Sequence, residues 1–271
     1  ELYKRGVWMN YVNIDGVPDF HSEEYSNKLT KYCVCIPVIN EGQRIEKELM
    51  RARNYGVDSV ADIIICDGGS TDGSTDSEKL KMYGVNTLLV KDGKGKQSAQ
   101  LRMGFWWALG RGYEGIITID GNNKDSIENA SDFIKKLDLG YDFIQGSRFI
   151  KGGRAVRTPI IRLLSLRLLH APIISLTAGH WFTDTTNAYR GYSRKYLMDK
   201  RVMPFRDIFM TYELLAYLST RASQLKMKVC EIPVTRVYPK SGKIPTKISF
   251  FRGNLELLKI LFMNLFRKYN V

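Results

Sequence analysis

The chain has 271 residues, with 41 Lys and Arg against 28 Asp and Glu, and 44% of its residues are hydrophobic. This composition excludes a disordered chain, a collagen-like repeat and a small fold that depends on disulfides. The net charge of +13 indicates an anionic partner, which could be nucleic acid, an anionic membrane surface or a phosphate-bearing small molecule.

The most apolar segments are 163–178 and 255–266, and charged residues such as Arg167 and Glu256 interrupt them. A membrane-spanning helix needs roughly 18 to 20 apolar residues in succession. We therefore expect no spanning helix, and the first residues show no signal-peptide pattern.

Short apolar runs alternate with helical patterns after an N-terminal extension. The runs that predict strands are 32–38, 61–66, 87–90, 115–119, 141–145 and 229–234, and the predicted helices are 41–55, 77–83, 97–109 and 126–137. The runs are apolar throughout, which is typical of a parallel sheet covered by helices on both faces. In such α/β sheets, ligands bind at the carboxyl ends of the strands.

Three of these strand ends are acidic and rich in glycine. Glu41 follows the first strand, 67–75 (DGGSTDGST) the second, and 120–125 (DGNNKD) the fourth. Clustered carboxylates repel one another unless a cation or a base donor lies among them. No P-loop or GxGxxG motif follows any strand. Carboxylates without His or Cys suit Mg²⁺ or Mn²⁺ bridging a diphosphate, which predicts a nucleotide-activated substrate.

Five motifs together resemble those of family 2 glycosyltransferases of the GT-A fold, and within it the polyprenyl-phosphate mannose and glucose synthases. They are PVINEG at 37–42, DGGSTDGST at 67–75, GKGKQSAQLRMG at 93–104, TIDGNN at 118–123 and GSRF at 146–149. The resemblance implies an α/β fold with a mostly parallel sheet flanked by helices. It also implies an extension over 1–30, a GT-A catalytic domain over 31–246 and a C-terminal amphipathic helical segment over 247–271.

On the donor side, the resemblance implies contacts with a UDP- or GDP-linked sugar. The implied nucleotide-sugar-binding residues are Pro37, Glu41, Asp67, Lys96, Arg102, Asp120 and Asn122. Asp120 and Asn122 take the place of the family's Asp-x-Asp pair, which holds the metal ion. Because Asn122 brings an amide oxygen where the family has a second carboxylate, we expect weaker affinity for Mg²⁺ or Mn²⁺.

On the acceptor side, Arg148 and Arg162 match arginines that hold the acceptor phosphate in the polyprenyl-phosphate synthases. Arginine presents a bidentate fork to phosphate, so this role agrees with its chemistry. Arg236 and Lys243 fall in a basic loop that resembles the segment closing over the donor, and they are further candidates for binding phosphate.

Asp184 and Glu213 are the two candidate catalytic carboxylates. A sugar hydroxyl as acceptor needs a base to take its proton. A phosphate acceptor is already ionised at pH 7 and needs none, in which case Asp184 only organises the site. Either carboxylate could instead pair with a neighbouring arginine.

Two segments could face a membrane. Segment 163–176 is strongly apolar with basic residues at its start, which is consistent with a lipid-facing helix or with a buried core helix. The final segment places Phe251, Leu255, Leu258, Phe262 and Leu265 on one helical face. That face predicts a membrane-surface helix, a cover for the sheet or a dimer contact.

The sequence therefore predicts a glycosyltransferase that moves a hexose to a lipid-linked or saccharide acceptor in surface polysaccharide or glycolipid synthesis, with inversion as in most of the family. Its expected location is cytoplasmic, peripheral on the inner face of the cell membrane. The alternatives are a polyprenyl-phosphate hexose synthase and, more distantly, a sugar-1-phosphate nucleotidyltransferase, which would need a Gly-rich loop that 40–42 does not provide. Nucleic acid is not an expected partner, because the basic residues form no recognised binding motif.

Overall fold

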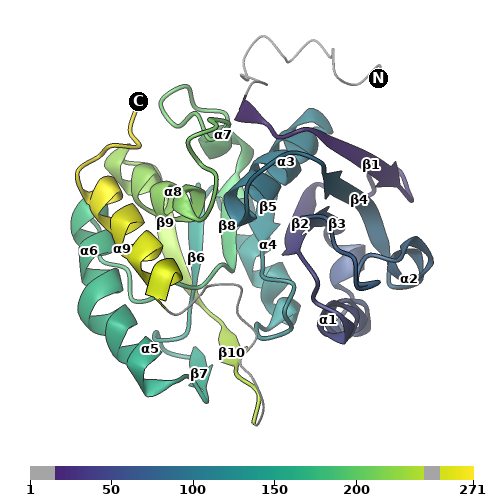
Figure 1. Ribbon diagram of the computed structural model, residues 1–271, viewed down its shortest axis with the longest axis horizontal. Helices are drawn as coiled ribbons and strands as arrows, with labels where there is room; N and C mark the ends of the chain where they lie inside the picture. The colour runs from purple at the N-terminus through teal and green to yellow at the C-terminus, as the bar shows by residue number, and fades with distance from the viewer. Residues whose placement is uncertain (1–15, 241–250) are drawn as a thin grey trace.

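The computed structural model describes residues 16–240 and 251–271, and these form a mixed α/β fold around an eight-stranded sheet, shown in Figure 1. The strand order is β1-β4-β3-β2-β5-β8-β6-β9. The strands are β1 (Phe20–Glu24), β2 (Tyr32–Val38), β3 (Asp62–Asp67), β4 (Val85–Lys91), β5 (Gly115–Thr118), β6 (Phe143–Ser147), β8 (Arg190–Ser193) and β9 (Val229–Pro233). A separate pair consists of β7 (Arg154–Val156) and β10 (Thr235–Val237).

All six predicted strands are confirmed, and β2 to β5 pair in parallel as expected. The sequence analysis did not predict β8, which runs antiparallel between β5 and β6. It also did not predict β1, which lies in the expected N-terminal extension and pairs antiparallel with β4. The sheet is therefore mainly parallel, with antiparallel pairings at one edge and near its middle.

Helices cover both faces of the sheet because alternate strand residues point to opposite sides. Cys33 and Cys35 of β2 face one layer, and Val34 and Ile36 face the other. The first layer contains α3 (Gln97–Gly110), α6 (Ala171–Ala178), α8 (Glu213–Gln224) and α9 (Phe251–Leu265); the second contains α1 (Gln43–Asn54), α2 (Ser77–Met82) and α4 (Ala130–Asp138). Short turns of helix lie at Val57–Ser59, Ile127–Asn129 and α7 (Arg194–Leu197).

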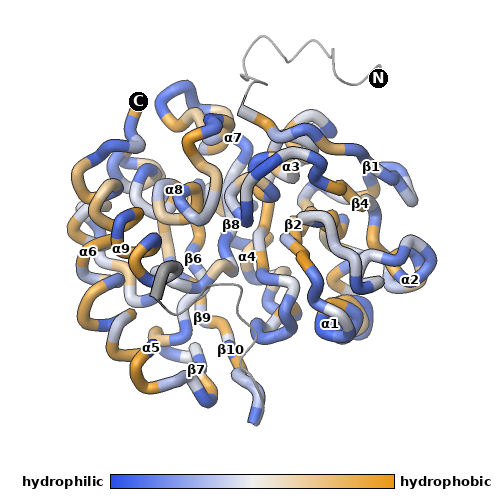
Figure 2. Tube along the Cα trace, in the orientation of Figure 1, coloured by the Kyte–Doolittle hydropathy of each residue, from blue (hydrophilic) through white to orange (hydrophobic). Residues whose placement is uncertain are grey.

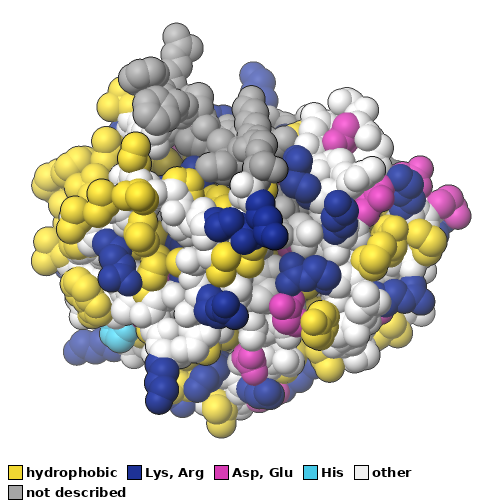
Figure 3. Space-filling view, turned by 90° about the horizontal axis from the view of Figure 1, so that it is seen from below, with side chains coloured by type: hydrophobic (Ala, Val, Ile, Leu, Met, Phe, Trp, Pro, Cys, Tyr) yellow, Lys and Arg dark blue, Asp and Glu magenta, His cyan; other side chains and the backbone are white. Residues whose placement is uncertain are grey.

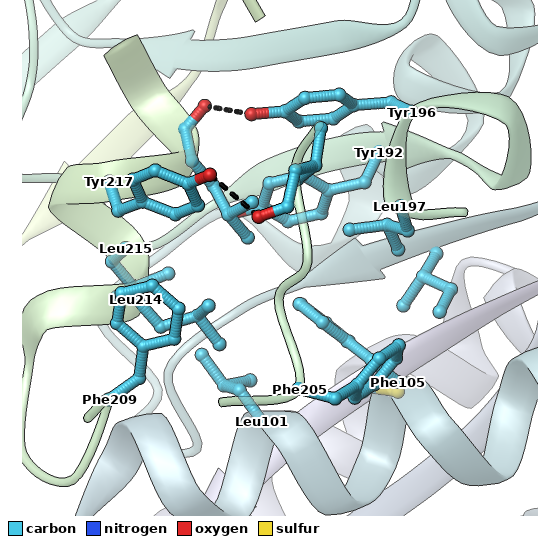
Figure 4. Packing of buried hydrophobic residues seen from close by; sticks show 14 of the residues in the cluster. Leu101, Phe105, Tyr192, Tyr196, Leu197, Phe205, Phe209, Leu214, Leu215 and Tyr217 are labelled. Atoms are coloured by element: carbon cyan, nitrogen blue, oxygen red, sulfur yellow. Dashed lines mark hydrogen bonds between the residues drawn. The ribbon is translucent and has the colours of Figure 1, made fainter. Parts of the chain in front are cut away.

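The first layer contains an aromatic core between α3, α8 and the sheet (Figure 4). Two buried tyrosines satisfy their hydroxyl groups there: Tyr196 donates to the Leu218 carbonyl at 2.7 Å, and Tyr217 donates to the Val202 carbonyl at 2.6 Å. Leu101 of α3 and Leu214 of α8 pack in the same cluster. This packing holds the first turns of α3 and α8 close together.

One helix of 19 residues, Ile160–Ala178, is long and apolar enough to cross a membrane, and it is the single such helix within the described residues. It comprises α5 (Ile160–Ser165), a π-helical turn (Leu166–His170) and α6. Arg167 and His170, which were expected to break this apolar segment, do not interrupt the helix. Only 28% of it is buried, and Figure 2 shows α5 as hydrophobic although it lies at the edge of the molecule.

The last helix, α9, buries Ile260 and Leu261 against the first helical layer. Leu255 and Phe262, which the sequence analysis placed on its apolar face, are exposed. The helix therefore packs against α6 and α8 on one side and presents apolar side chains on another.

Candidate active site

The loops that follow β2 and β3 are joined by hydrogen bonds at the carboxyl edge of the sheet. The Asn40 amide N–H donates to Ser70 Oγ at 3.0 Å, and the Thr71 N–H donates back to Asn40 Oδ1 at 2.8 Å. The Gly42 N–H donates to Asp72 Oδ2 at 2.9 Å. Asn40 has a φ of 47°, a left-handed conformation that asparagine tolerates better than most residues. These contacts fix the two loops as one wall.

Asp67, Glu41 and Pro37 all lie at this wall. The buried Asp67 carboxylate accepts hydrogen bonds from the Ser70 N–H at 2.9 Å and the Ser70 hydroxyl at 2.6 Å. Glu41 pairs with Arg44 at 2.8 Å, and Pro37 lies in β2 opposite Cys66 of β3. The structure thus brings together the three residues expected at the nucleoside.

Asp120 follows β5 and lies among polar groups from three segments. Its Oδ1 accepts a hydrogen bond from Gln97 Nε2 at 2.9 Å, and its Oδ2 lies 3.2 Å from Arg236 Nη2. Burial acts to raise the pKa of Asp120, but the charges of Arg236 and Lys124 outweigh it and lower that pKa. Asp120 is therefore ionised at neutral pH.

Asn122 supplies the second oxygen of the predicted metal site. Its Nδ2 donates to Asp120 Oδ2 at 3.4 Å, while its Oδ1 is buried and has no hydrogen-bond partner among the described residues, so this oxygen is free to accept a cation. No group of three or more His, Cys, Asp or Glu side chains forms a metal site in the described parts of the chain. A site of one carboxylate and one amide oxygen suits Mg²⁺, which takes most of its remaining ligands from phosphates and water. The residues present fit such an ion.

Arg236 belongs to β10 and is buried between two carboxylates. Besides Asp120, its guanidinium pairs with Asp125, which has no exposed surface. Backbone bonds hold this arrangement: the Ser126 N–H donates to the Thr235 carbonyl at 3.0 Å, and the Val237 N–H to the Lys124 carbonyl at 2.7 Å. Arg236 is thus part of a short strand at the Asp120 loop, whereas the sequence analysis placed it in a closing loop. Lys243 lies outside the described residues.

Tyr238 is buried beside Arg236 and is surrounded by cations. Arg162 Nη1 donates to its hydroxyl at 3.1 Å, and Lys124 Nζ lies 5.4 Å from its ring centre. Burial acts to raise the pKa of Tyr238, but the charge of Arg236 and the hydrogen bond from Arg162 lower it overall. Arg162 and Arg236, both predicted to bind phosphate, therefore meet at one aromatic side chain.

Asp184 and Arg148, the predicted base and acceptor residue, form a buried ion pair with each other. Arg148 Nε lies 2.6 Å from Asp184 Oδ2, and Nη2 lies 2.9 Å from Oδ1. The Arg148 backbone N–H adds a third bond to the same carboxylate at 3.1 Å. Asp184 has no exposed surface and Arg148 is 4% exposed. Asp184 is therefore paired with a neighbouring arginine, which is one of the three alternatives left open above.

The other three predicted residues lie where the start of α3 meets residues 210–213. Glu213 Oε2 accepts the Thr211 N–H at 2.6 Å, and Lys96 Nζ lies 3.3 Å from Glu256 of α9. Arg102 is buried and donates to the Gly16 carbonyl, and burial lowers its pKa. Arg102 therefore contacts the segment that leads into β1, and its guanidinium is not at the Asp120 cluster.

Four residues at this edge were not among the predicted site residues: Gln97, Lys124, Asp125 and Tyr238. Lys124 and Asp125 lie in the same DGNNKD motif as Asp120, and Gln97 begins the helix after a predicted donor segment. Their positions in these motifs were an available signal. Nothing in the local sequence indicates that Tyr238 lies beside Arg162, 76 residues earlier.

The chain belongs to glycosyl transferase family 2, whose profile matches residues 33–200. It is a glycosyltransferase with the GT-A type of fold. The chain is 26% identical over 207 residues to polyprenol monophosphomannose synthase of Mycolicibacterium smegmatis, covering 74% of this chain and 76% of the relative. It is 27% identical over 216 residues to undecaprenyl-phosphate mannosyltransferase of Micrococcus luteus, covering 77% and 84%.

Solved structures support the fold. The glucosyl-3-phosphoglycerate synthase of Mycobacterium tuberculosis in complex with UDP aligns with a TM-score of 0.62 at 14% identity, covering 86% of this chain and 79% of that one. The same enzyme with Mn²⁺, UDP and glucosyl-3-phosphoglycerate aligns with a TM-score of 0.54 at 15% identity, covering 86% and 77%. The expected α/β GT-A fold is confirmed.

Proposed function

We propose that this glycosyltransferase transfers a hexose from a UDP- or GDP-linked sugar to a lipid-linked phosphate at a membrane surface. One observation carries the proposal: the helix Ile160–Ala178 contains both Arg162, which reaches the cationic group around Tyr238, and a row of exposed apolar side chains. Ile160, Ile161, Leu164 and Leu168 are all at least half exposed. A single helix thus offers a cation for a phosphate and an apolar surface for the chain attached to it.

The face of the molecule shown in Figure 3 has an apolar part and a basic part, which supports an acceptor with a lipid chain and a phosphate group. Figure 3 shows apolar side chains gathered on one side of the face and Lys and Arg side chains toward its middle. Arg162 and Arg236 act on the head group in this proposal, since arginine binds phosphate through paired hydrogen bonds. The apolar surface and the excess of positive charge match an anionic membrane, which we propose to be the inner face of the cell membrane.

The names of the relatives point to the same acceptor class. Two are named for polyprenol or undecaprenyl phosphate and mannose. The glucosyl-3-phosphoglycerate synthase was crystallised with UDP-glucose and phosphoglyceric acid, another phosphate-bearing acceptor. We therefore propose a lipid phosphate as the acceptor and a nucleotide-linked sugar as the donor.

On the donor side, the proposal assigns the nucleoside to the wall formed by Glu41, Asp67 and Pro37. Asp120 and Asn122 would hold Mg²⁺ or Mn²⁺, which when bound neutralises charge on the diphosphate leaving group. Solved relatives contain Mn²⁺ or Mg²⁺ together with UDP. The fit of the Asn122 oxygen to a cation supports the same assignment.

A phosphate acceptor changes what the protein must supply. Its oxygen is ionised at neutral pH, so no side chain has to remove a proton, and positioning of the two reactants becomes the main contribution. The buried Asp184–Arg148 pair fits that role. We expect the anomeric carbon to invert, since a phosphate oxygen would attack opposite the leaving diphosphate.

The proposal is tested in two stages with purified protein. First, UDP, GDP, CDP and TDP are each added with Mn²⁺, and the melting temperature is recorded; UDP or GDP should raise it, since a ligand of the folded state stabilises that state. Second, the corresponding labelled nucleotide-sugars are incubated with polyprenyl phosphate, with free polyprenol and with a saccharide acceptor.

Labelled lipid should form from polyprenyl phosphate and not from free polyprenol. Asp120→Ala should lose transfer by at least about 100-fold with a melting temperature close to that of the wild type. If no nucleotide raises the melting temperature, the donor assignment is wrong. If only the saccharide is glycosylated, the acceptor assignment is wrong.

A further inference from the structure

Glu48 of α1 is a buried carboxylate outside every predicted role. It lies on the face of α1 that packs against the sheet, together with Ile45, Leu49 and Ala52, and has no exposed surface. A polar group at such a position costs free energy unless it makes compensating hydrogen bonds. Its Oε2 makes one such bond, accepting the Asn123 backbone N–H at 2.7 Å.

Asn123 is the residue directly after Asn122, and its backbone conformation needs support. Its φ is 55°, a left-handed conformation that asparagine tolerates better than most residues but that still costs more than it would for glycine. Two α1 side chains hold it: Glu48 through the backbone N–H, and Arg51 Nη1, which donates to Asn123 Oδ1 at 2.9 Å. The backbone N–H and the side-chain Oδ1 of Asn123 are thus both bound by α1.

The same helix holds the rest of the loop. Arg51 Nη1 also lies 3.2 Å from the Asp125 carbonyl, and Nη2 lies 2.6 Å from Glu128 Oε2. Gly121 leaves no space beneath the loop, because a Cβ there would come within 3.0 Å of Val38 and 3.3 Å of Ile45. The loop 120–125 therefore packs directly against α1 and the end of β2. Glu48 and Arg51 hold it there through hydrogen bonds.

We infer that Glu48 and Arg51 are positioning residues that set the direction of the Asn122 oxygen and so the affinity of the Asp120–Asn122 pair for a divalent cation. The inference rests on the proposed metal-dependent function. Asn122 contributes an amide oxygen, a weaker ligand for a hard cation than a carboxylate, so its alignment matters more. Outer groups that orient metal ligands typically change metal affinity by 10- to 100-fold.

The test measures Mn²⁺ binding directly, with no turnover involved. Free Mn²⁺ is followed by electron paramagnetic resonance as it is titrated into protein with UDP, and separately with GDP. Glu48→Leu removes the acceptor and should weaken Mn²⁺ binding by about tenfold or more. Glu48→Gln keeps an oxygen for the Asn123 N–H and should stay within about threefold of the wild type.

Leu49→Ala is the matched control, since Leu49 is equally buried on α1 and belongs to its apolar core cluster. It should lower the melting temperature and leave Mn²⁺ affinity within about threefold. Arg51→Met provides a second test at a partly exposed position, where folding is less at risk, and should weaken Mn²⁺ binding by about tenfold.

The inference is overturned if Arg51→Met binds Mn²⁺ as the wild type does. It is also overturned if Leu49→Ala or Glu48→Gln loses as much Mn²⁺ affinity as Glu48→Leu. If the wild type itself binds no Mn²⁺ with either nucleotide, the proposed metal dependence fails and the inference fails with it. Wild-type binding with unchanged variants overturns the inference alone.

Discussion

Arg236 Nη2 lies 3.2 Å from the carboxylate of Asp120, although 116 residues separate the two in the chain. The same guanidinium pairs with Asp125, so one arginine offsets part of the charge of two carboxylates in the loop that follows β5. Buried ion pairs therefore hold the positive charge of Arg236 at this edge of the sheet. A donor diphosphate would meet a loop whose carboxylates are already partly neutralised.

Arg236→Met should lower the free energy of unfolding by about 3 kcal/mol, because it leaves the fully buried Asp125 without its partner. Urea denaturation measures the loss. Adding Asp125→Asn should restore more than half of it, since the unpaired charge is then gone. Arg154→Met, at an exposed arginine of the neighbouring β7, should change stability by less than about 0.5 kcal/mol. An Arg236→Met protein as stable as the wild type would contradict the assigned ion pairs.

Asp184 and Arg148 should behave as one unit. Asp184→Asn and Arg148→Met should each cost about 3 kcal/mol of stability, because each leaves a buried charge unpaired. The double variant should cost at least about 1.5 kcal/mol less than the sum of the two. Denaturant curves of the four proteins give this coupling energy, and strictly additive losses would show that the two side chains do not interact.

Glu213→Gln should reduce transfer to polyprenyl phosphate by less than about tenfold. The Glu213 carboxylate is bound to the Thr211 N–H and hydroxyl at 2.6 and 2.8 Å, and a phosphate acceptor needs no base. Removal of a general base typically costs about 10²- to 10⁴-fold. Initial rates with labelled donor decide the question, and a loss in that larger range would make Glu213 the base.

His170 predicts a pH dependence of stability. Burial, followed by the charge of Arg190, lowers the pKa of His170 to about 4, while Asp184 acts in the opposite direction. The unfolded chain takes up this proton near pH 6.5 and the folded chain only near 4, so the unfolded state binds more protons between these values. The contribution of His170 is complete above pH 6.5 and falls by on the order of 3 kcal/mol as the pH drops to 4.

The comparison that isolates this effect is His170→Asn, which keeps a polar group beside Thr185. Its unfolding free energy should decrease less than that of the wild type between pH 6.5 and 4. Urea curves at half-unit pH steps give both profiles. Parallel profiles would mean that His170 is protonated equally in both states.

The exposed face of the helix Ile160–Ala178 should determine binding to membranes. Replacing Leu164 and Leu168 with Ser should weaken binding to vesicles of phosphatidylglycerol and phosphatidylcholine by roughly tenfold or more, because two exposed leucines that would enter the membrane interface are lost. Leu139→Ser, at an exposed leucine after α4, is the control and should bind as the wild type. Co-sedimentation measures both, and equal binding by the double variant would place the contact elsewhere.

Much of the fold could be predicted from the sequence because its signals are local. The continuous apolar runs of β2, β3 and β5 predict a buried parallel sheet, and the acidic motifs after them place Asp67 and Asp120 at one edge. β8 escaped prediction because Arg190 and Gly191 open it, and its arginine is satisfied by backbone carbonyls that only the folded chain supplies. β1 is an edge strand with mostly exposed residues, so it has no apolar pattern.

The sequence by itself determined which residues follow the strands, because strand, turn and helix preferences act over a few neighbours and the motifs lie within single loops. The tertiary structure decided how those residues are used. It paired Arg148 with Asp184, bridged Asp120 and Asp125 with Arg236, and turned Arg102 toward Gly16. Charge pairing acts through space, and the partners here come from segments that only the crossover connections of the sheet bring within hydrogen-bond distance.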